Sequence, residues 1–313
     1  MDDRVILSGL DPAEYVHPMD REARTALERV PGLTPVVRKF NEVGYDRLLI
    51  LESMASKVRV TPRQFPELYE LFQETKSVLG ISWHVDLFVQ QQFSLNAFAA
   101  GVEYPHVTLT TELLSHLTQE ELRFVLGHEL GHIHCQHILY HQIGIYLPRL
   151  ITLMGSATLG LGALVGTGFE VALYDWIRKS EFSADRAGLL ACQDLNAAKA
   201  VFCRFAGVPR DWFDRLNLEE IHRQADDFQR MVTSDSVNRF YRFVGQMWNT
   251  HPWVIVRFSD LLQWIDRGVY DAILNKKRKA SQAFVGQCTC GEPFEEGSFY
   301  CIACGRQVAN EKM

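Results

Sequence analysis

Histidines are concentrated in one short part of the sequence. Five of the eleven histidines lie between residues 128 and 141, and the first two belong to the stretch His-Glu-Leu-Gly-His at 128–132. Residues four apart lie on the same face of a helix, so His128 and His132 can bind one zinc ion from successive turns. Glu129 lies about 100° round the helix axis from His128. That position suits a general base that takes a proton from an attacking water, whose pKa zinc lowers to about 7.

The residues around this motif predict a helix. Thr118 and Glu121 have the spacing of a capping box, and apolar residues recur at helical intervals from Leu122 to Ile133. The predicted helix begins near residue 119 and is roughly two dozen residues long. Five matching positions also occur by chance in ordinary helices. The capped, apolar context favours a metal site over two unrelated histidines.

The third metal ligand must come from elsewhere in the chain. Metzincins continue the motif as HExxHxxGxxH, but Cys135 and Ile138 stand at the glycine and last histidine positions here. The other common solution is a glutamate on a later helix. Glu181 and Asp185 are four apart in a helix predicted over about 170–192. Glu181 can complete the site and Asp185 can hold the outer nitrogen of a ligating histidine, although two solvated acids are the alternative.

The remaining histidines of the cluster point away from the His128/His132 face. His137 and His141 are four apart and could bind a second metal, but no HExxH-like acid accompanies them. We therefore expect His134, His137 and His141 to lie on the polar surface of the helix.

Four of the seven cysteines lie in the last 30 residues, in the pattern C-x-C-x10-C-x2-C formed by Cys288, Cys290, Cys301 and Cys304. The chain opens without a secretory signal, so these residues predict thiolate metal ligands rather than disulfides. The pattern resembles a zinc ribbon with a structural zinc, although the first pair is separated by one residue instead of two to four. A cysteine-rich tail without metal is the alternative. We expect this module to bind a protein partner or the substrate.

Length and composition predict a soluble globular protein with a small appendage. The chain has 313 residues, 47% hydrophobic and 22% charged, and its net charge of −6 gives no reason to expect nucleic acid as a partner. We predict a main domain over 1–274 that includes a helical region 1–60, a linker over 275–286 and the ribbon module over 287–308. The basic residues of the linker suit a solvated segment better than a nuclear signal.

The expected fold is α+β and mostly helical, with a small β-sheet. Alternating β-branched and aromatic residues predict three strands, and the helix signals on either side of them have identifiable breaks and caps. The predicted elements are helices within 11–76 with breaks at 30–35 and 60–67 (Thr61 as cap and Pro62 at the helix start), strands within 81–91, 93–101 and 105–114, and a helix capped by Thr250 that stops at Gly268.

Four motifs in this order resemble the HtpX and CAAX-prenyl-protease family of zinc metallopeptidases. They are Asn-Ala-Phe at 96–98, the HExxH helix, the segment Glu-Phe-Ser-Ala-Asp-Arg at 181–186, and Thr-His-Pro at 250–252 followed by Arg257. The resemblance covers roughly residues 60–265, and four ordered matches are more specific than any one of them.

The resemblance implies a gluzincin-type zincin domain with zinc on His128, His132 and Glu181. It implies that Asn96, Ala97 and Phe98 form an edge strand that pairs with the backbone of a protein or peptide substrate. It also implies that His251 donates to the oxyanion of the tetrahedral intermediate, and that Arg257 supports the site from behind. The function expected is that of a zinc endopeptidase. A catalytically weak protein with the same fold, acting through its zinc ribbon, is the alternative.

The apolar tract 150–169 has enough uncharged residues for one membrane crossing. However, His132 and Glu181 must meet at one zinc on one side of any membrane, so the number of crossings between them must be even. The intervening chain is too short for two spans. We therefore expect a glycine-rich helical hairpin that is buried, acts as a lid or dips into a membrane surface. The predicted location is the cytoplasm, with peripheral membrane contact through residues 143–173 as the alternative.

Overall fold

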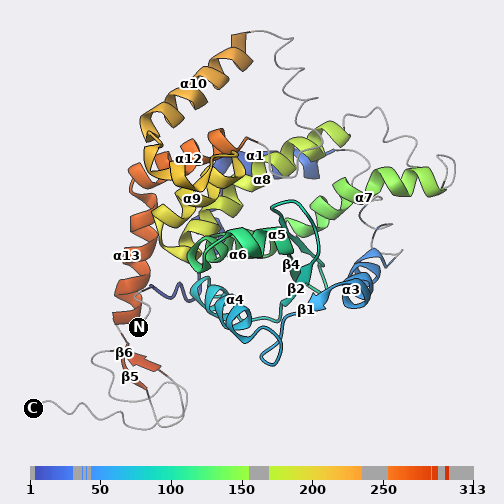
Figure 1. Ribbon diagram of the computed structural model, residues 1–313, viewed down its shortest axis with the longest axis horizontal. Coiled ribbons are helices and arrows are strands. Elements are labelled where there is room, and N and C mark those ends of the chain that lie inside the picture. Colours follow the sequence, from blue (N-terminus) through green and yellow to red (C-terminus); the bar gives the residue numbers. More distant parts are fainter. Residues whose placement is uncertain are drawn as a thin grey trace, which may run out of the picture.

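Two long helices, α6 (Gln119–His134) and α8 (Phe169–Cys192), cross the centre of the molecule beside a small sheet (Figure 1). The computed structural model describes residues 4–30, 37, 40, 44–154, 169–234, 253–282, 284–287 and 293–295. The mostly helical α+β fold predicted from the sequence is confirmed. The other helices and short 3-10 turns are η1 (Pro12–Glu14), α1 (Pro18–Glu28), α3 (Tyr45–Ser56), α4 (Pro66–Val78), α5 (Thr111–His116), α7 (Ile138–Met154), α9 (Leu195–Phe205), η3 (Arg210–Arg215), α10 (Leu218–Ser234), α12 (Val254–Asp266) and α13 (Val269–Gln282).

The sheet contains four strands in the order β1-β2-β4-β3. The parallel pair β2–β4 lies in the middle, and β1 and β3 are antiparallel to their neighbours. The three predicted strands are present but shorter than expected, and β1 was not foreseen. Their bounds are β1 Val58–Arg59, β2 Asp86–Gln90, β3 Ala97–Ala100 and β4 His106–Thr110. Among the described strands β3 forms an edge, as the sequence predicted.

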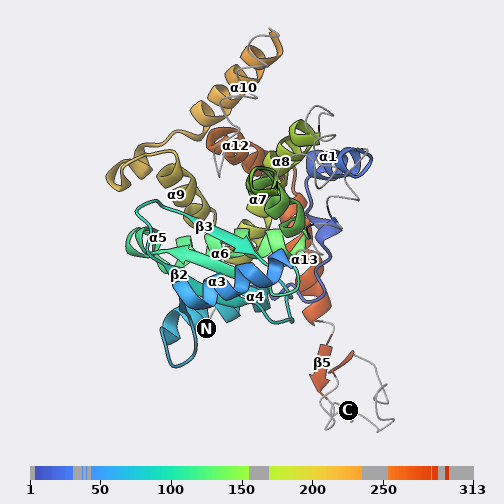
Figure 2. The same ribbon diagram turned by 90° about the vertical axis from the view of Figure 1, so that its right-hand side faces the viewer.

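Both faces of the sheet are covered by helices. Successive side chains of a strand point to opposite faces, so neighbouring residues of β4 contact different helices. Val107 and Leu109 join the main apolar core with Leu126 and Leu130 of α6. On the other face, the buried His106 bonds to Ser53 of α3. Figure 2 shows α3 lying across the strands. The sheet is therefore a layer between α3 on one face and α6 on the other. The candidate site lies near the edge formed by β3.

Glycines on α6 allow it to approach α8 closely. A β-carbon at Gly127 would lie 2.3 Å from the β-carbon of Ala191, and one at Gly131 would lie 2.5 Å from that of Ala187. Real β-carbons do not approach so closely, so only glycine fits at these two positions. Their spacing of four places both glycines on the face of α6 that touches α8. This contact sets the distance between the two helices that carry the predicted metal ligands.

Two helix starts predicted from the sequence are wrong. The helix expected to begin at Pro62 begins at Pro66, where Phe65 precedes it with φ of 63°. The helix expected to be capped by Thr250 begins at Val254, after Trp253 with φ of 61°. Left-handed backbone at bulky residues is unusual, so sequence patterns do not predict it. The predicted stop at Gly268 agrees with the end of α12, since Gly268 has φ of 72° and follows the C-cap.

The segment 275–282, predicted to be an exposed linker, is the second half of helix α13. Lys277 is buried and its Nζ donates to the carbonyl oxygens of Ser8 and Gly9 at 3.2 and 3.0 Å. Glu14 accepts from Lys276 at 2.6 Å. This part of the chain is therefore helical and is tied to the N-terminal region through Lys276 and Lys277.

Some predicted features fall outside the described residues. They include the four C-terminal cysteines and residues 155–168 of the apolar tract. The first residues of that tract, 150–154, belong to α7. Strand β5 (Phe284–Gln287) lies mostly in the predicted linker and pairs antiparallel with β6 (Pro293–Glu295) of the predicted ribbon module. In the part of the chain that is described, no helix is both long enough and apolar enough to span a membrane. The zinc ribbon stays a prediction.

Candidate metal centre

Helix α6 carries the histidine motif and begins at the predicted capping box. The Thr118 hydroxyl accepts from the backbone of Glu121 at 3.3 Å, and the Glu121 carboxylate accepts from the backbone of Thr118 at 2.9 Å. The helix has 16 residues and ends at His134, with Cys135 as its C-cap, so the predicted length of about two dozen is wrong. Gln136 has φ of 58° and turns the chain before α7 begins at Ile138. His137 therefore lies in a connector rather than on the motif helix.

Three side chains converge at the centre of the molecule. The Nε2 atoms of His128 and His132 are 3.2 Å apart. The Glu181 carboxylate oxygens lie 3.3 Å from Nε2 of His132 and 3.7 Å from Nε2 of His128. All three residues are at most 5% exposed. Zinc bonds of about 2.0–2.2 Å in a tetrahedron place ligand atoms roughly 3.3 Å apart, so these donors fit a zinc ion.

The positions of the other histidines do not suggest a second metal. In the described part of the chain, the group of His128, His132 and Glu181 is the one set of three ligand-type side chains whose atoms lie within 4.8 Å of one another. His137 and His141 have no third ligand that would complete a site with them among these residues.

Asp185 and Arg257 lie directly behind the ligand cluster. His128 donates from Nδ1 to Asp185 at 3.0 Å, which leaves its Nε2 facing the cluster. Arg257 donates to both oxygens of Asp185 at 2.7 and 2.5 Å and pairs with Glu181 at 2.9 Å. Burial by itself would raise the pKa of Asp185, but Arg257 and His128 outweigh it and lower that pKa. Burial would likewise lower the pKa of Arg257, but Asp185 and Glu181 raise it well above its usual value.

The charges of the site favour a divalent cation. Glu129, Glu181 and Asp185 are buried carboxyl groups that carry three negative charges when ionised, and Arg257 returns one positive charge. Buried charges are costly unless they are neutralised by partners or by a metal. A divalent cation at the two histidines and Glu181 would balance this group of side chains.

Glu129 faces a cleft beside the ligand cluster. The side chain is 3% exposed. Edge strand β3 contributes Ala97 to the cleft, and helices α6 and α9 contribute a largely apolar wall. The lining residues are Ala97, Phe124, Val125, His128, Glu129, Asp185, Val201, Phe202, Phe205 and Arg257. A peptide bond lying along β3 would thus pass both the ligand cluster and a carboxylate.

The three residues predicted to bind substrate do not all face this cleft. Ala97 lines it, whereas the Phe98 ring lies 4.8 Å from Nζ of Lys57, next to the α3 face of the sheet. Adjacent strand residues point to opposite faces, which explains the difference. Thr110 of β4 holds the Asn96 carbonyl oxygen through its backbone N–H at 3.1 Å. The Phe98 ring therefore does not line the cleft.

The prediction that His134, His137 and His141 lie on the polar surface is wrong for His137, and His141 is half-buried. His137 is 1% exposed, and its Nδ1 lies 3.0 Å from Nδ1 of His132. His141 bonds to the Ser180 hydroxyl at 2.8 Å, and burial together with His132 and His137 lowers its pKa well below the usual value. His134 is half-buried and bonds to the Tyr15 hydroxyl at 2.9 Å. The break after α6 turns His137 inward, which the assumption of one continuous helix could not anticipate.

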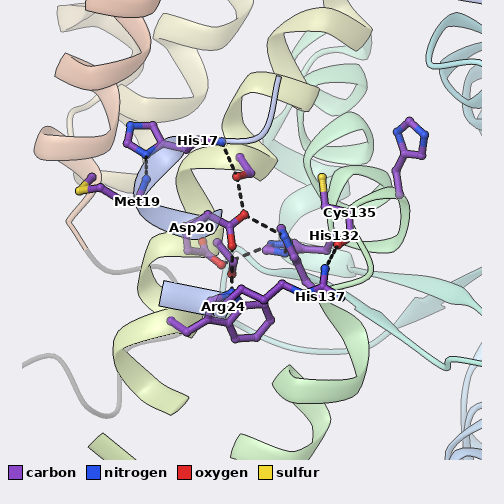
Figure 3. A network of polar contacts seen from close by, with 12 residues as sticks. His17, Met19, Asp20, Arg24, His132, Cys135 and His137 are labelled. Carbon is purple, nitrogen blue, oxygen red and sulfur yellow. Dashed lines mark hydrogen bonds and ion pairs between the residues drawn. The ribbon is translucent and has the colours of Figure 1, made fainter. Parts of the chain in front are cut away.

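Asp20 of α1 is the acid that accompanies His137 (Figure 3). Its carboxylate is 1% exposed and accepts hydrogen bonds from His137 at 3.0 Å, Ser183 at 2.6 Å and Trp176 at 2.9 Å. Burial would raise the pKa of Asp20, but these hydrogen bonds outweigh it and bring the pKa to about 2. Asp20 is therefore ionised at neutral pH. Sequence reasoning missed it because 117 positions separate it from His137.

His251, predicted to stabilise the oxyanion, lies outside the described residues, so its role stays a prediction. Sequence reasoning also missed Gly127 and Gly131. A signal for them was present, because each glycine directly precedes a histidine of the motif and the two are four apart, on one helix face.

Comparison with known proteins gives one family match. The model described as Peptidase family M48 matches residues 62–265, which is more than half of the chain. The plastoglobule-localized metallopeptidase 48 of Arabidopsis thaliana, described as chloroplastic, is 27% identical over 279 residues, which cover 88% of this chain and 79% of the plant protein.

Bacterial relatives match over shorter lengths. A protease HtpX homolog of Streptococcus gordonii is 34% identical over 109 residues, which cover 34% of this chain and 36% of the relative. A protease HtpX homolog of Ligilactobacillus salivarius is 28% identical over 162 residues, which cover 51% of this chain and 53% of the relative. The match thus spans about a third to a half of these bacterial relatives. No solved structure matches the chain significantly.

Proposed function

This chain belongs to peptidase family M48, a metallopeptidase family, and we propose that it is a zinc-dependent endopeptidase. The observation that carries the proposal is the buried convergence of His128, His132 and Glu181 beside a cleft that also contains Glu129. These residue types and distances suit a zinc ion with three protein ligands, which leaves one coordination position open for chemistry.

In this proposal, zinc supplies Lewis acidity that polarises the substrate carbonyl and acidifies water. Glu129 takes the proton from the attacking water and passes it to the leaving amine. Asp185 orients the imidazole of His128, and Arg257 holds both Asp185 and Glu181 in place. His251 would donate a hydrogen bond to the oxyanion, as the family resemblance implies.

The substrate proposed is an extended protein or peptide segment. Strand β3 lies at a sheet edge next to the cleft, and an exposed edge can pair with a peptide backbone. The aromatic wall formed by Phe124, Phe202 and Phe205 suits an apolar substrate side chain next to the cleaved bond. Backbone pairing together with one apolar contact would give broad specificity for unfolded segments.

Digestion of an unfolded protein tests this proposal. Purified full-length chain is incubated with reduced, alkylated casein, and the fragments are identified by mass spectrometry. We expect internal cuts that disappear after metal removal with 1,10-phenanthroline and dialysis, and that return with added Zn²⁺. Loss of single terminal residues would indicate an exopeptidase instead. Cleavage that continues without metal, or no cleavage at all, would contradict the proposal.

We propose a second, structural zinc at Cys288, Cys290, Cys301 and Cys304, in a module that contacts a partner or the substrate. Elemental analysis should then give close to two zinc ions per chain. His132→Ala should remove one of them and Cys301→Ser the other. One zinc per chain that is lost with His132→Ala alone would remove the ribbon from the proposal. We further propose a cytoplasmic location, with residues 143–173 as the part that would touch a membrane surface.

A further inference from the structure

A chain of hydrogen bonds leads from the candidate metal site to helix α1. His132 Nδ1 lies 3.0 Å from His137 Nδ1, and His137 Nε2 lies 3.0 Å from an Asp20 oxygen (Figure 3). All three residues are buried, with 4%, 1% and 1% of their surfaces exposed. The order is thus metal-facing histidine, connector histidine, carboxylate.

The carboxylate decides where the protons of this chain lie. Asp20 is ionised and can only accept, so Nε2 of His137 carries a hydrogen. In the neutral form of His137 one ring nitrogen donates and the other accepts, so in that form its Nδ1 accepts. The nitrogen that faces it, Nδ1 of His132, must therefore donate. Nε2 of His132 is then without a hydrogen, and this atom faces His128 and Glu181 at 3.2 and 3.3 Å.

We propose that Asp20 and His137 are positioning residues that hold His132 in the tautomer whose Nε2 lone pair can bind the metal. The inference rests on the proposed zinc site. It adds which residues fix the tautomer of the second ligand, His132. Asp185 fixes the tautomer of His128 directly, by accepting a hydrogen bond from its Nδ1. The two ligands are thus oriented by different acids, on α8 and on α1.

Further contacts fix Asp20 in place. Ser183 of α8 donates to the same oxygen as His137, and Trp176 donates to the other oxygen. Ser183 also accepts from the backbone N–H of His17, which is the N-cap of α1. Asp20 lies outside the segment 62–265 that the family model matches. The N-terminal helix therefore contributes to the site although it is remote from the motif in sequence.

Nitrogen NMR of the metal-free wild type tests the tautomer directly. In ¹⁵N-labelled protein, with the signals of His132 identified by their loss in His132→Ala, we expect a protonated Nδ1 and an unprotonated Nε2. The opposite tautomer, or a mixture of the two, would overturn the proposal. This measurement requires no altered His137 or Asp20 and therefore does not depend on how well such variants fold.

Zinc affinity gives the second readout, by competition with a chromogenic chelator. His137→Phe keeps a buried ring but removes the acceptor, so we expect the zinc Kd to rise about 10- to 100-fold. His137→Asn can place an amide oxygen near the Nδ1 position and should recover most of the affinity. An unchanged Kd in His137→Phe would contradict the proposal.

His106→Phe is the matched control. His106 is also 1% exposed and bonds to Ser53 on the α3 side of the sheet, so the variant should lose stability without a change in zinc Kd. His132→Ala gives the affinity of a broken site. If the wild type binds zinc no better than His132→Ala, the proposed zinc site itself fails. If the wild type binds more tightly and His137→Phe matches it, only the role of His137 and Asp20 fails.

Discussion

Replacing Glu129 with glutamine should lower kcat for casein cleavage by about 10²- to 10⁴-fold and leave zinc bound. The amide has nearly the shape of the carboxylate but cannot accept the proton of the attacking water. Glu129 is not among the three ligands that converge, so the metal should remain. The measurements are initial cleavage rates at saturating substrate and zinc content by elemental analysis.

Glu121→Gln is the matched control for this variant. Glu121 is a buried carboxylate on the same helix, where it accepts from the backbone of Thr118, and glutamine can serve in the same capping box. This variant should retain wild-type activity. Unchanged activity in Glu129→Gln would sink the catalytic assignment and favour an interaction protein with a metallopeptidase fold. Loss of zinc in Glu129→Gln would show that Glu129 holds the site together instead.

Gly131→Ala should destabilise the protein by about 1–2 kcal/mol and weaken zinc binding at least tenfold. The added β-carbon would lie 2.5 Å from that of Ala187, and neither atom can rotate away. Overpacking of this kind costs about 1–3 kcal/mol, which the better helix propensity of alanine offsets by up to about 1 kcal/mol. The strain moves α8, which carries Glu181, and misplacement by about 1 Å can cost a factor of 100 at a site.

The exchange of one methyl group across the interface tests this explanation. Gly131→Ala combined with Ala187→Gly restores the total volume, so the double variant should recover stability and zinc affinity relative to Gly131→Ala. Gly144→Ala is the control, because the atom nearest to its β-carbon, at 2.6 Å, is the flexible end of Ile177. Urea unfolding and zinc competition measure both effects. A double variant that is no better than Gly131→Ala would show that the α6–α8 distance is not what the glycine protects.

Local sequence was enough for the half of the site that lies on α6. The capping box at Thr118 and Glu121 set the start of the helix, and the spacing of His128 and His132 put both on one face. The failure of the longer histidine pattern at Cys135 and Ile138 directed attention to Glu181. The helix start and the shared face of His128 and His132 agree with the structure because they depend on residues within one or two helical turns, where geometry follows directly from sequence spacing.

Helix ends were the weakest predictions for a physical reason. Phe65, Gln136 and Trp253 have positive φ next to α4, α6 and α12. Glycine and asparagine are the usual residues in that conformation, and large side chains adopt it only when the surrounding structure imposes it. The same cause explains the misplacement of His137, since the turn at Gln136 carries it from the expected surface into the interior.

The sequence by itself determined which residue types the candidate metal site can use: two histidines and a glutamate on one helix, and a later pair of acids. Only the tertiary structure decided which other residues contact and orient those side chains. The approach of α6 to α8 depends on Gly127 and Gly131 facing alanines of the other helix. The link from His132 through His137 to Asp20 joins segments more than 100 positions apart. Such contacts arise from packing between elements, and the spacing of residues within one element does not contain them.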